Sequence, residues 1–280
     1  RGLGDVYKRQ IMLRIAYFIS ILFFLLSCTS QSTVSINNGY VDFPEVRELK
    51  AKTIQLDTAL FRYPFRVHAW DNKAVVLDLH GTDHYFHAFS YPEFHYLSSF
   101  GKRGDAPEEM LSAENFRWGE KCLWTLDANK SELTELGFAL SGDTLLRQEV
   151  VKLDKDILRA LDFIIYEDST FIIPDYTGDN RFCQVSSEGK LLRKFGAIPS
   201  ANEEALANSR PALAQAWRSF IDYNPRKGVL VAATQLGEVL EIYNLKDSTH
   251  VVCTGPHGEP EFQVAEGYGI PTGIMGFGDV

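Results

Sequence analysis

The chain has 280 residues, of which 45% are hydrophobic and 12% aromatic, a composition typical of a globular protein with an apolar core. Its formal net charge of -9 argues against a nucleic-acid partner, which would require a clustered basic face. The same charge argues against electrostatic docking on anionic lipid. The length suits one large domain or two small ones.

The N-terminal region is predicted to carry a targeting signal. The first residues, RGLGDVYKRQ, look like translated adapter sequence, so we exclude residues 1–11 from the fold argument and take Met12 as the initiator. An apolar run from Ile15 to Leu26 follows Arg14. The run has about a dozen residues, whereas a membrane-spanning helix needs ~20. Its length and flanks predict a signal peptide over residues 12–27.

The end of this run resembles a bacterial lipobox, Leu25-Leu26-Ser27-Cys28. In that motif the cysteine is acylated by diacylglycerol and becomes the new N-terminus, so Cys28 is predicted to carry a lipid anchor. An ordinary signal peptide with a chance cysteine, or a buried strand, are the alternatives. No other cofactor is expected. The polar residues 28–40 would form a tether, and the absence of an acidic cluster in TSQSTVS favours an outer-membrane lipoprotein that faces the periplasm.

The rest of the chain repeats a strand-rich unit. Short β-rich runs between turn signals recur near residues 61–101, 114–153, 158–196 and 216–255. The period of about 40–55 residues lies near the range of propeller blades. We therefore predict an all-β fold, a β-propeller of four-stranded antiparallel blades; a large β-sandwich would not be expected to repeat a four-strand unit. Three units end in glycine, at Gly101, Gly196 and Gly255, where an open backbone conformation would help the chain leave the blade.

Three further elements are predicted. Residues 202–217 form the one good helix candidate, and Pro211 interrupts it. Residues 53–60, TIQLDTAL, should form an extra strand that closes the ring. The C-terminal stretch stops on what reads as the start of a strand, so residues 41–280 are expected to be a propeller truncated at its C-terminus, with four blades and the start of a fifth.

The chain resembles a known group of proteins. The carrying features are Leu26-Ser27-Cys28, the blade repeats, and FGKRGDAPEEM at residues 100–110. The last stretch is similar to the F-G-x-x-G-x-G-P-G-E linker of TolB-like or NHL-like six-bladed propellers in bacterial lipoproteins. It departs from that pattern because Asp105 and Ala106 precede Pro107, and Glu108 stands where glycine is usual. The resemblance implies a six-bladed ring but no particular activity.

Metal and catalytic motifs are weak. Five histidines lie in the first unit: His68, His80, His84, His87 and His95. His80, Asp83 and His84 could ligate zinc, but a polar hairpin is the favoured interpretation. Asp175, Asp179 and Asn180 offer oxygen ligands for calcium, but they equally suit a β-turn. We predict no metal site and no catalytic residue, because the sequence contains no G-x-S-x-G motif and no phosphate-binding loop.

The three remaining cysteines, Cys122, Cys183 and Cys253, are far apart in strand-like runs. This spacing predicts small buried apolar residues rather than a disulfide framework.

An arginine is predicted to open the first strand of each unit, and these equivalent arginines provide the candidate ligand site. The four residues are Arg66, Arg117, Arg159 and Arg218. In a propeller the first strand lines the central channel, so these guanidinium groups could form a ring that binds a carboxylate or phosphate bidentately, with His68, Trp70 and Tyr223 at the same mouth. The alternative is a structural network in which Asp162 and Asp222 pair with the arginines.

The favoured hypothesis for function is a non-enzymatic, membrane-anchored propeller lipoprotein that serves as a binding or scaffold module of the bacterial envelope. Its expected partners are the membrane, through the lipid anchor, and an unknown protein or anionic small-molecule ligand, with no nucleic acid. The alternative is a metal-dependent propeller enzyme, of the lactonase or lyase kind, that acts in the channel mouth.

Overall fold

The computed structural model describes residues 35–56, 61–120, 122–138, 145–265 and 268–279. The predicted signal peptide and Cys28 lie outside these residues. Within the described part of the chain, no helix is long and apolar enough to cross a membrane.

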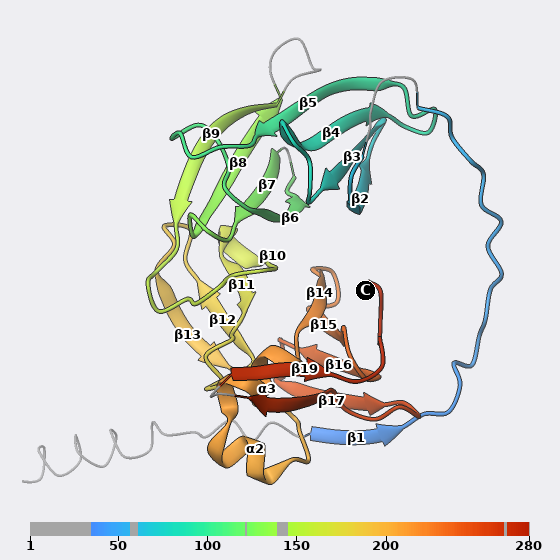
Figure 1. Cartoon of the computed structure of the whole chain (residues 1–280), viewed down its shortest axis with the longest axis vertical. Coiled ribbons are helices and arrows are strands. Elements are labelled where there is room, and N and C mark those ends of the chain that lie inside the picture. The colour runs from blue at the N-terminus through green and yellow to red at the C-terminus, as the bar shows by residue number, and fades with distance from the viewer. Residues whose placement is uncertain (1–34, 57–60, 121, 139–144, 266–267, 280) are drawn as a thin grey trace, which may run out of the picture. The chain divides into compact units, whose positions relative to one another are not determined.

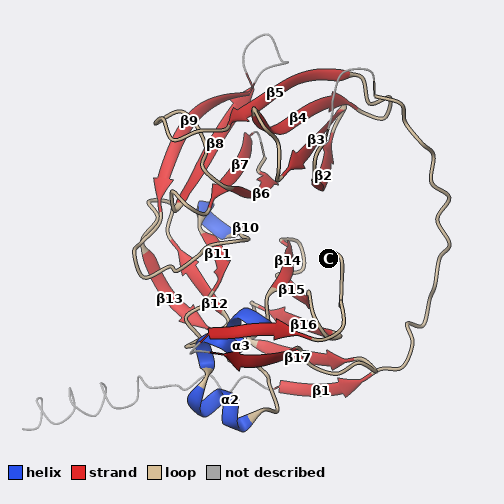
Figure 2. Cartoon of the chain, in the orientation of Figure 1, coloured by secondary structure: helices blue, strands red, loops and turns tan. Residues whose placement is uncertain are grey.

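Three antiparallel sheets of four strands and one sheet of five strands, which contains four antiparallel strands, make up most of the chain (Figures 1 and 2). Blade 1 contains β2 (Pro64–Trp70), β3 (Lys73–Asp78), β4 (His84–Ser90) and β5 (Tyr96–Lys102). Blade 2 contains β6 (Ala113–Trp118), β7 (Cys122–Asp127), β8 (Glu132–Phe138) and β9 (Leu145–Lys152). Blade 3 contains β10 (Ile164–Ile165), β11 (Phe171–Pro174), β12 (Phe182–Val185) and β13 (Leu191–Phe195). Blade 4 contains β14 (Ser219–Asn224), β15 (Val229–Thr234), β16 (Val239–Asn244) and β17 (Thr249–Thr254).

The blades form a propeller in which the first strand of each sheet lies innermost, as Figure 1 shows. Neighbours within each blade follow the order of the chain, so each blade is built from successive hairpins. The fold class and the four repeated units predicted from the sequence are confirmed. After blade 4 comes a further hairpin, β18 (Glu261–Ala265) with β19 (Tyr268–Thr272).

The extra strand differs from the prediction. Residues 53–56 form no strand, and residues 57–60 lie outside the described residues. Instead β1 (Ser35–Gly39), in the segment expected to be a free tether, pairs in parallel with β17 as a fifth strand of the blade 4 sheet. The outermost strand of a blade has backbone N–H and C=O groups without partners along its free edge. In blade 4 that strand is β17, and β1 pairs with its edge. The hydrogen bond from the Tyr40 amide to the Thr254 carbonyl, 3.0 Å long, continues this pairing.

Aromatic contacts join each blade to the next. Phe86 of blade 1 meets Phe116 of blade 2 edge-on, with ring centroids 5.7 Å apart. Trp124 of blade 2 meets Phe171 of blade 3 at 5.0 Å, and Phe182 of blade 3 meets Tyr243 of blade 4 at 5.2 Å. These residues belong to three apolar clusters, one between each pair of successive blades. Edge-to-face pairs contribute about 0.5–1.5 kcal/mol each beyond their buried area, so they favour one register between neighbouring blades.

A helical insertion separates blades 3 and 4. It consists of α2 (Glu203–Asn208) and α3 (Arg210–Ala216). The Asn202 side chain accepts a hydrogen bond from the Ala205 amide and caps α2. Pro211 lies in the first turn of α3, where the missing amide hydrogen costs no helical bond. The predicted interruption of the helix at Pro211 is confirmed.

The glycines at the ends of the predicted units fall into two groups. Gly101 and Gly196 have φ angles of 64° and 71°, which favour glycine as expected. The prediction is wrong for Gly255, which is not among the residues of positive φ. There the constraint is space, because an added Cβ would lie 2.6 Å from a Glu238 carboxylate oxygen.

The three cysteines Cys122, Cys183 and Cys253 lie in strands, as predicted. The predicted burial holds only for Cys183, because Cys122 and Cys253 are half-buried.

Candidate functional site

Phenylalanines lie on or next to the innermost strands: Phe65, Phe116, Phe163 and Phe220. Arginine follows in blades 1 and 2, as Arg66 and Arg117, but the pairing register shows that these two arginines are not equivalent. Arg66 lies opposite Leu77 and Asn115 lies opposite Leu126, in both cases one residue before the aspartate at the end of the second strand. Arg66 is therefore equivalent to Asn115 in the repeat, and Arg117 is equivalent to His68.

Arg66 and Arg117 converge on one buried carboxylate, Asp162. An Arg117 Nη2–Asp162 Oδ1 distance of 3.0 Å forms a salt bridge, and Arg66 Nη1 lies 4.0 Å from Oδ2. Asn115 donates to Asp162 and accepts from Arg66 Nη1 at 3.1 Å. All four residues are at most 7% exposed. Asp162 is thus the centre of a buried polar network that links the innermost parts of blades 1, 2 and 3.

The network extends to blade 4 and to the C-terminal segment. Arg117 donates to the carbonyl oxygen of Ile221 at 2.5 Å and lies 3.5 Å from the carboxylate of Asp222. Arg66 forms a 2.8 Å salt bridge with Asp279, and burial lowers its pKa, an effect that nearby Asp162 opposes. Because acids meet both guanidinium groups, the geometry supports the structural alternative more than an open anion site.

Arg159 and Arg218 do not join this network, so the four predicted arginines form no ring. Arg159 lies in an exposed loop and donates to the Gln215 side chain at 3.2 Å. Arg218 is half-buried just before β14. Both arginines act on Tyr176: burial raises the pKa of its hydroxyl to about 12, and the nearby guanidinium charges oppose that rise. The prediction failed because it aligned the arginines by their nearness to a strand rather than by the pairing register of each blade.

The aromatic residues expected at the channel mouth lie on innermost strands. His68 and Trp70 belong to β2, and Tyr223 belongs to β14. The His68 ring meets Phe116 edge-on at 5.2 Å, and burial, Arg117 and Arg66 lower the pKa of His68. Trp70 is half exposed and stacks on Trp118 with ring centroids 6.2 Å apart. Tyr223 packs against Tyr166 instead.

Blades 1 and 4 contact each other beside Arg66. The rings of Phe65 and Phe220 lie 6.1 Å apart, and the Arg66 guanidinium lies 5.6 Å from the Phe220 centroid. These contacts leave the inner network well packed, which suits a role in holding the blades together.

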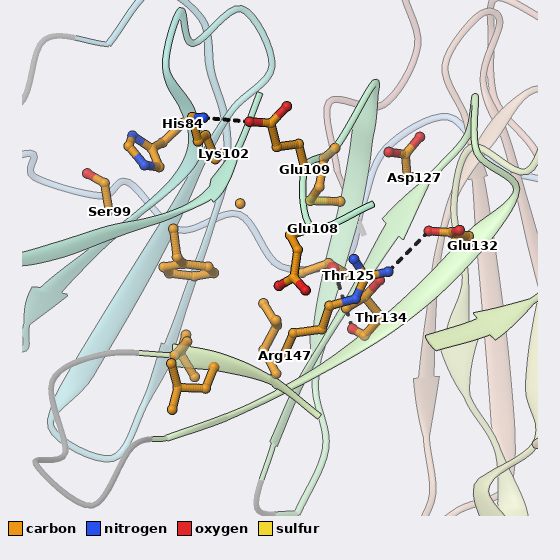
Figure 3. A pocket seen from close by; sticks show the side chains of 16 residues that line it. His84, Ser99, Lys102, Glu108, Glu109, Thr125, Asp127, Glu132, Thr134 and Arg147 are labelled. Atoms are coloured by element: carbon orange, nitrogen blue, oxygen red, sulfur yellow. Dashed lines mark hydrogen bonds and ion pairs between the residues drawn. The ribbon is translucent and has the colours of Figure 1, made fainter. Parts of the chain in front are cut away.

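A cavity of about 300 Å³ lies instead between blades 1 and 2 (Figure 3). Strands β5, β7, β8 and β9 contribute to its walls, together with the linker that joins the two blades. Its apolar lining residues are Phe100, Met110, Leu136, Leu145 and Leu146. Sequence reasoning missed this site, although the stretch 100–110 was already notable for its departure from the linker pattern.

Ion pairs hold most of the charged groups around this cavity. Lys102 lies 2.5 Å from Glu109, which raises the pKa of the lysine and lowers that of the carboxylate. Glu132 bonds Lys152 at 2.5 Å and Arg147 at 3.4 Å, the latter drawn in Figure 3. Arg147 also donates to the Pro107 carbonyl oxygen, so the side chain ties the linker to β9.

Asp127, at the end of β7, has a structural role. Its carboxylate accepts hydrogen bonds from four backbone amides, those of Leu111, Ser112, Asn129 and Lys130, at 2.7–3.3 Å. Asp78 of blade 1 accepts in the same way from the amides of Arg62 and Tyr63. The repeat therefore uses an aspartate after the second strand to hold the chain that enters the first.

Two of the residues considered for metal binding have other partners. His80 packs against Tyr63. Asp175 lies 3.1 Å from the ammonium group of Lys194. Among the residues that the structure describes, no group of three or more histidine, cysteine or acidic side chains is placed to hold a metal ion.

Comparison with known proteins agrees with this architecture. The family model described as TolB-like 6-blade propeller-like matches residues 42–280. The chain belongs to this TolB-like family. No curated protein matches it.

Several solved structures are similar to this TolB-like chain. One is a Bacteroides fragilis protein named as exported, which is 14% identical and has a TM-score of 0.49. The match covers 80% of this chain and 60% of the other. A DUF4221 family member from Bacteroides vulgatus has 12% identity, a TM-score of 0.48, and coverage of 80% and 66%. A streptogramin B lyase has 13% identity, a TM-score of 0.45, and coverage of 71% and 57%. The chain thus spans less than two thirds of the length of each of these proteins.

Proposed function

We propose that this TolB-like propeller is a ligand-binding module of the bacterial envelope. The observation that carries the proposal is the cavity between blades 1 and 2, with its apolar lining and charged rim. Small-molecule sites are concave, mostly apolar, and supplied with a few polar groups that orient the ligand. Its principal ionisable groups are paired with one another, as in Lys102–Glu109 and Arg147–Glu132, an arrangement that suits recognition better than proton transfer or nucleophilic attack.

The propeller is carried on a lipid anchor at Cys28 and faces the periplasm from the outer membrane. The lipobox-like Leu26-Ser27-Cys28 sequence supports this part of the proposal. A diacylglycerol with a further acyl chain supplies the two hydrophobic signals that stable anchoring requires. The pairing of β1 with β17 leaves only a short segment, residues 29–34, between the anchor and the first strand of the fold.

Metabolic labelling with a fatty-acid probe tests the anchor. We expect the wild-type protein to take up the label and partition with membranes, and we expect Cys28→Ser to lose both properties. Cys253→Ser is the matched control, because it removes a different thiol and should keep the label. A labelled Cys28→Ser variant would end the lipoprotein proposal.

Metal analysis of the purified Cys28→Ser protein tests the binding role against the enzymatic alternative. Stoichiometric calcium or zinc would favour a metal-dependent enzyme. A protein that contains substoichiometric metal after dialysis, and that binds a ligand in the cavity, would agree with the proposal.

A further inference from the structure

Acidic side chains outnumber basic ones among the residues that line the cavity between blades 1 and 2. Four carboxylates line it, those of Glu108, Glu109, Asp127 and Glu132, against the two cations of Lys102 and Arg147. Backbone amides occupy Asp127, and lysine or arginine side chains occupy Glu109 and Glu132. Within the described ranges, no hydrogen bond or ion pair reaches Glu108, whose carboxylate extends from the linker towards the middle of the lining side chains (Figure 3).

A hydroxyl adds a second polar group. Thr134 of β8 lines the cavity and is 8% exposed. Its backbone carbonyl accepts from the Thr125 hydroxyl at 3.4 Å, but no hydrogen bond engages its own hydroxyl in the part of the chain that the structure describes. This hydroxyl can therefore pair with a hydrogen-bonding group of a ligand.

We propose that this cavity binds a small amphipathic amine, which deepens the ligand-binding function proposed above and rests on it. The apolar part of the ligand lies against Phe100, Met110 and Leu136. The ammonium group donates hydrogen bonds to the Glu108 carboxylate and the Thr134 hydroxyl. An ammonium has three donors and no acceptor, which matches these two oxygen acceptors, whereas a carboxylate ligand would be repelled by the unpaired Glu108 carboxylate.

Calorimetric titration of the full-length Cys28→Ser protein with three probes of one apolar shape tests the proposal. The probes are hexylamine, hexanol and hexanoate. We expect hexylamine to bind saturably and about 5- to 10-fold more tightly than hexanol, since charge-assisted bonds at a partly exposed rim are weaker than buried ones. Hexanoate should bind more weakly than either. The preference for the amine should decrease with added salt.

Three variants assign this binding to the cavity. Glu108→Gln should reduce the amine affinity about 5- to 10-fold and leave hexanol binding unchanged. Thr134→Val should reduce it by about 3- to 5-fold. Leu136→Trp should fill the floor and abolish binding of all three probes. Glu149→Gln, an equal change of charge on an exposed part of β9 that does not line the cavity, is the control and should bind as the wild type does.

Two results would overturn the proposal: hexanoate binding as tightly as hexylamine, or no saturable hexylamine binding. Equal losses in Glu108→Gln and Glu149→Gln would also overturn it, because the effect would then be one of net charge. If Leu136→Trp does not fold, the rim variant Glu108→Gln still decides the outcome. The fatty-acid labelling experiment tests the anchor separately from ligand binding. A failure of the amine-site proposal and a failure of the anchor proposal are therefore distinguishable.

Discussion

Replacing Asp162 by alanine should severely destabilise the propeller. The carboxylate accepts hydrogen bonds from Asn115, from the Phe163 amide at 2.7 Å and from Arg117 at 3.0 Å. It also lies 4.0 Å from Arg66, and only 5% of the residue is exposed. Its removal would leave two guanidinium groups without their common buried partner.

The expected loss follows from the burial of this network. Removing one partner of a buried ion pair costs about 3–5 kcal/mol, since an uncompensated charge remains. Arg66 would keep its contact with Asp279, and Arg117 would keep the half-exposed Asp222. We therefore expect a loss near the lower end, about 3 kcal/mol, which is a large part of the ~5–15 kcal/mol that stabilises a typical protein.

Urea unfolding of the Cys28→Ser protein, followed by far-ultraviolet circular dichroism, measures this loss. The midpoint should fall in Asp162→Ala while the m-value stays constant. Asp222→Ala removes the more exposed partner of Arg117 and should cost less than about 1 kcal/mol. A cost below about 1 kcal/mol for Asp162→Ala as well would refute the structural role of the network.

Three further predictions concern the other parts of the fold. Because Asn38 faces Cys253 in the parallel pairing of β1 with β17, Asn38→Cys should form an intramolecular disulfide on oxidation, seen as loss of both thiols to maleimide, and the same change with Cys253→Ser should not. Since the pKa of His68 is lowered in the folded state, the unfolded state binds more protons; unfolding free energy should fall as pH drops from about 7 to 5, and His68→Gln should flatten this dependence. Arg181→Met should cost about 3–5 kcal/mol in urea unfolding, because it leaves the buried Glu241, 2.7 Å away, without its cation.

The repeated strands could be predicted because their signals are local. Alternating apolar residues and turn sequences such as DNK and TGDN mark each hairpin, and a proline at position 211 marks the break between two helices. These features act within a few residues of one another. Their outcome therefore depends little on the rest of the chain.

The predicted arginine ring was wrong because equivalent positions depend on the pairing register. Irregularities of pairing between Pro64 and Arg66, and between Ala113 and Asn115, shift the chain near the start of β2 and β6. A shift of one residue turns a side chain to the other face of a strand. Arg66 therefore matches Asn115 rather than Arg117. Arg159 and Arg218 lie outside the first strands and so in different surroundings.

The parallel pairing of β1 and the cavity between blades 1 and 2 were missed for a related reason. Ser35 faces His250, and Arg147 reaches the Pro107 carbonyl, so both features join segments far apart in the chain. No local pattern marks such contacts. They form because the fold brings an unpaired strand edge to one segment and a linker to another.

The linker at residues 100–110 connects the structure to the proposed ligand. Gly101, the second-last residue of β5, has a positive φ, and Met110 belongs to the apolar cluster between the blades. These residues serve the fold. Glu108 stands where the resembling linkers usually have glycine, is exposed, and extends over the cavity (Figure 3). Since the fold does not use this carboxylate, the departure from the linker pattern is where the sequence has room to specify a ligand, as expected when function lies in sites placed on a common scaffold.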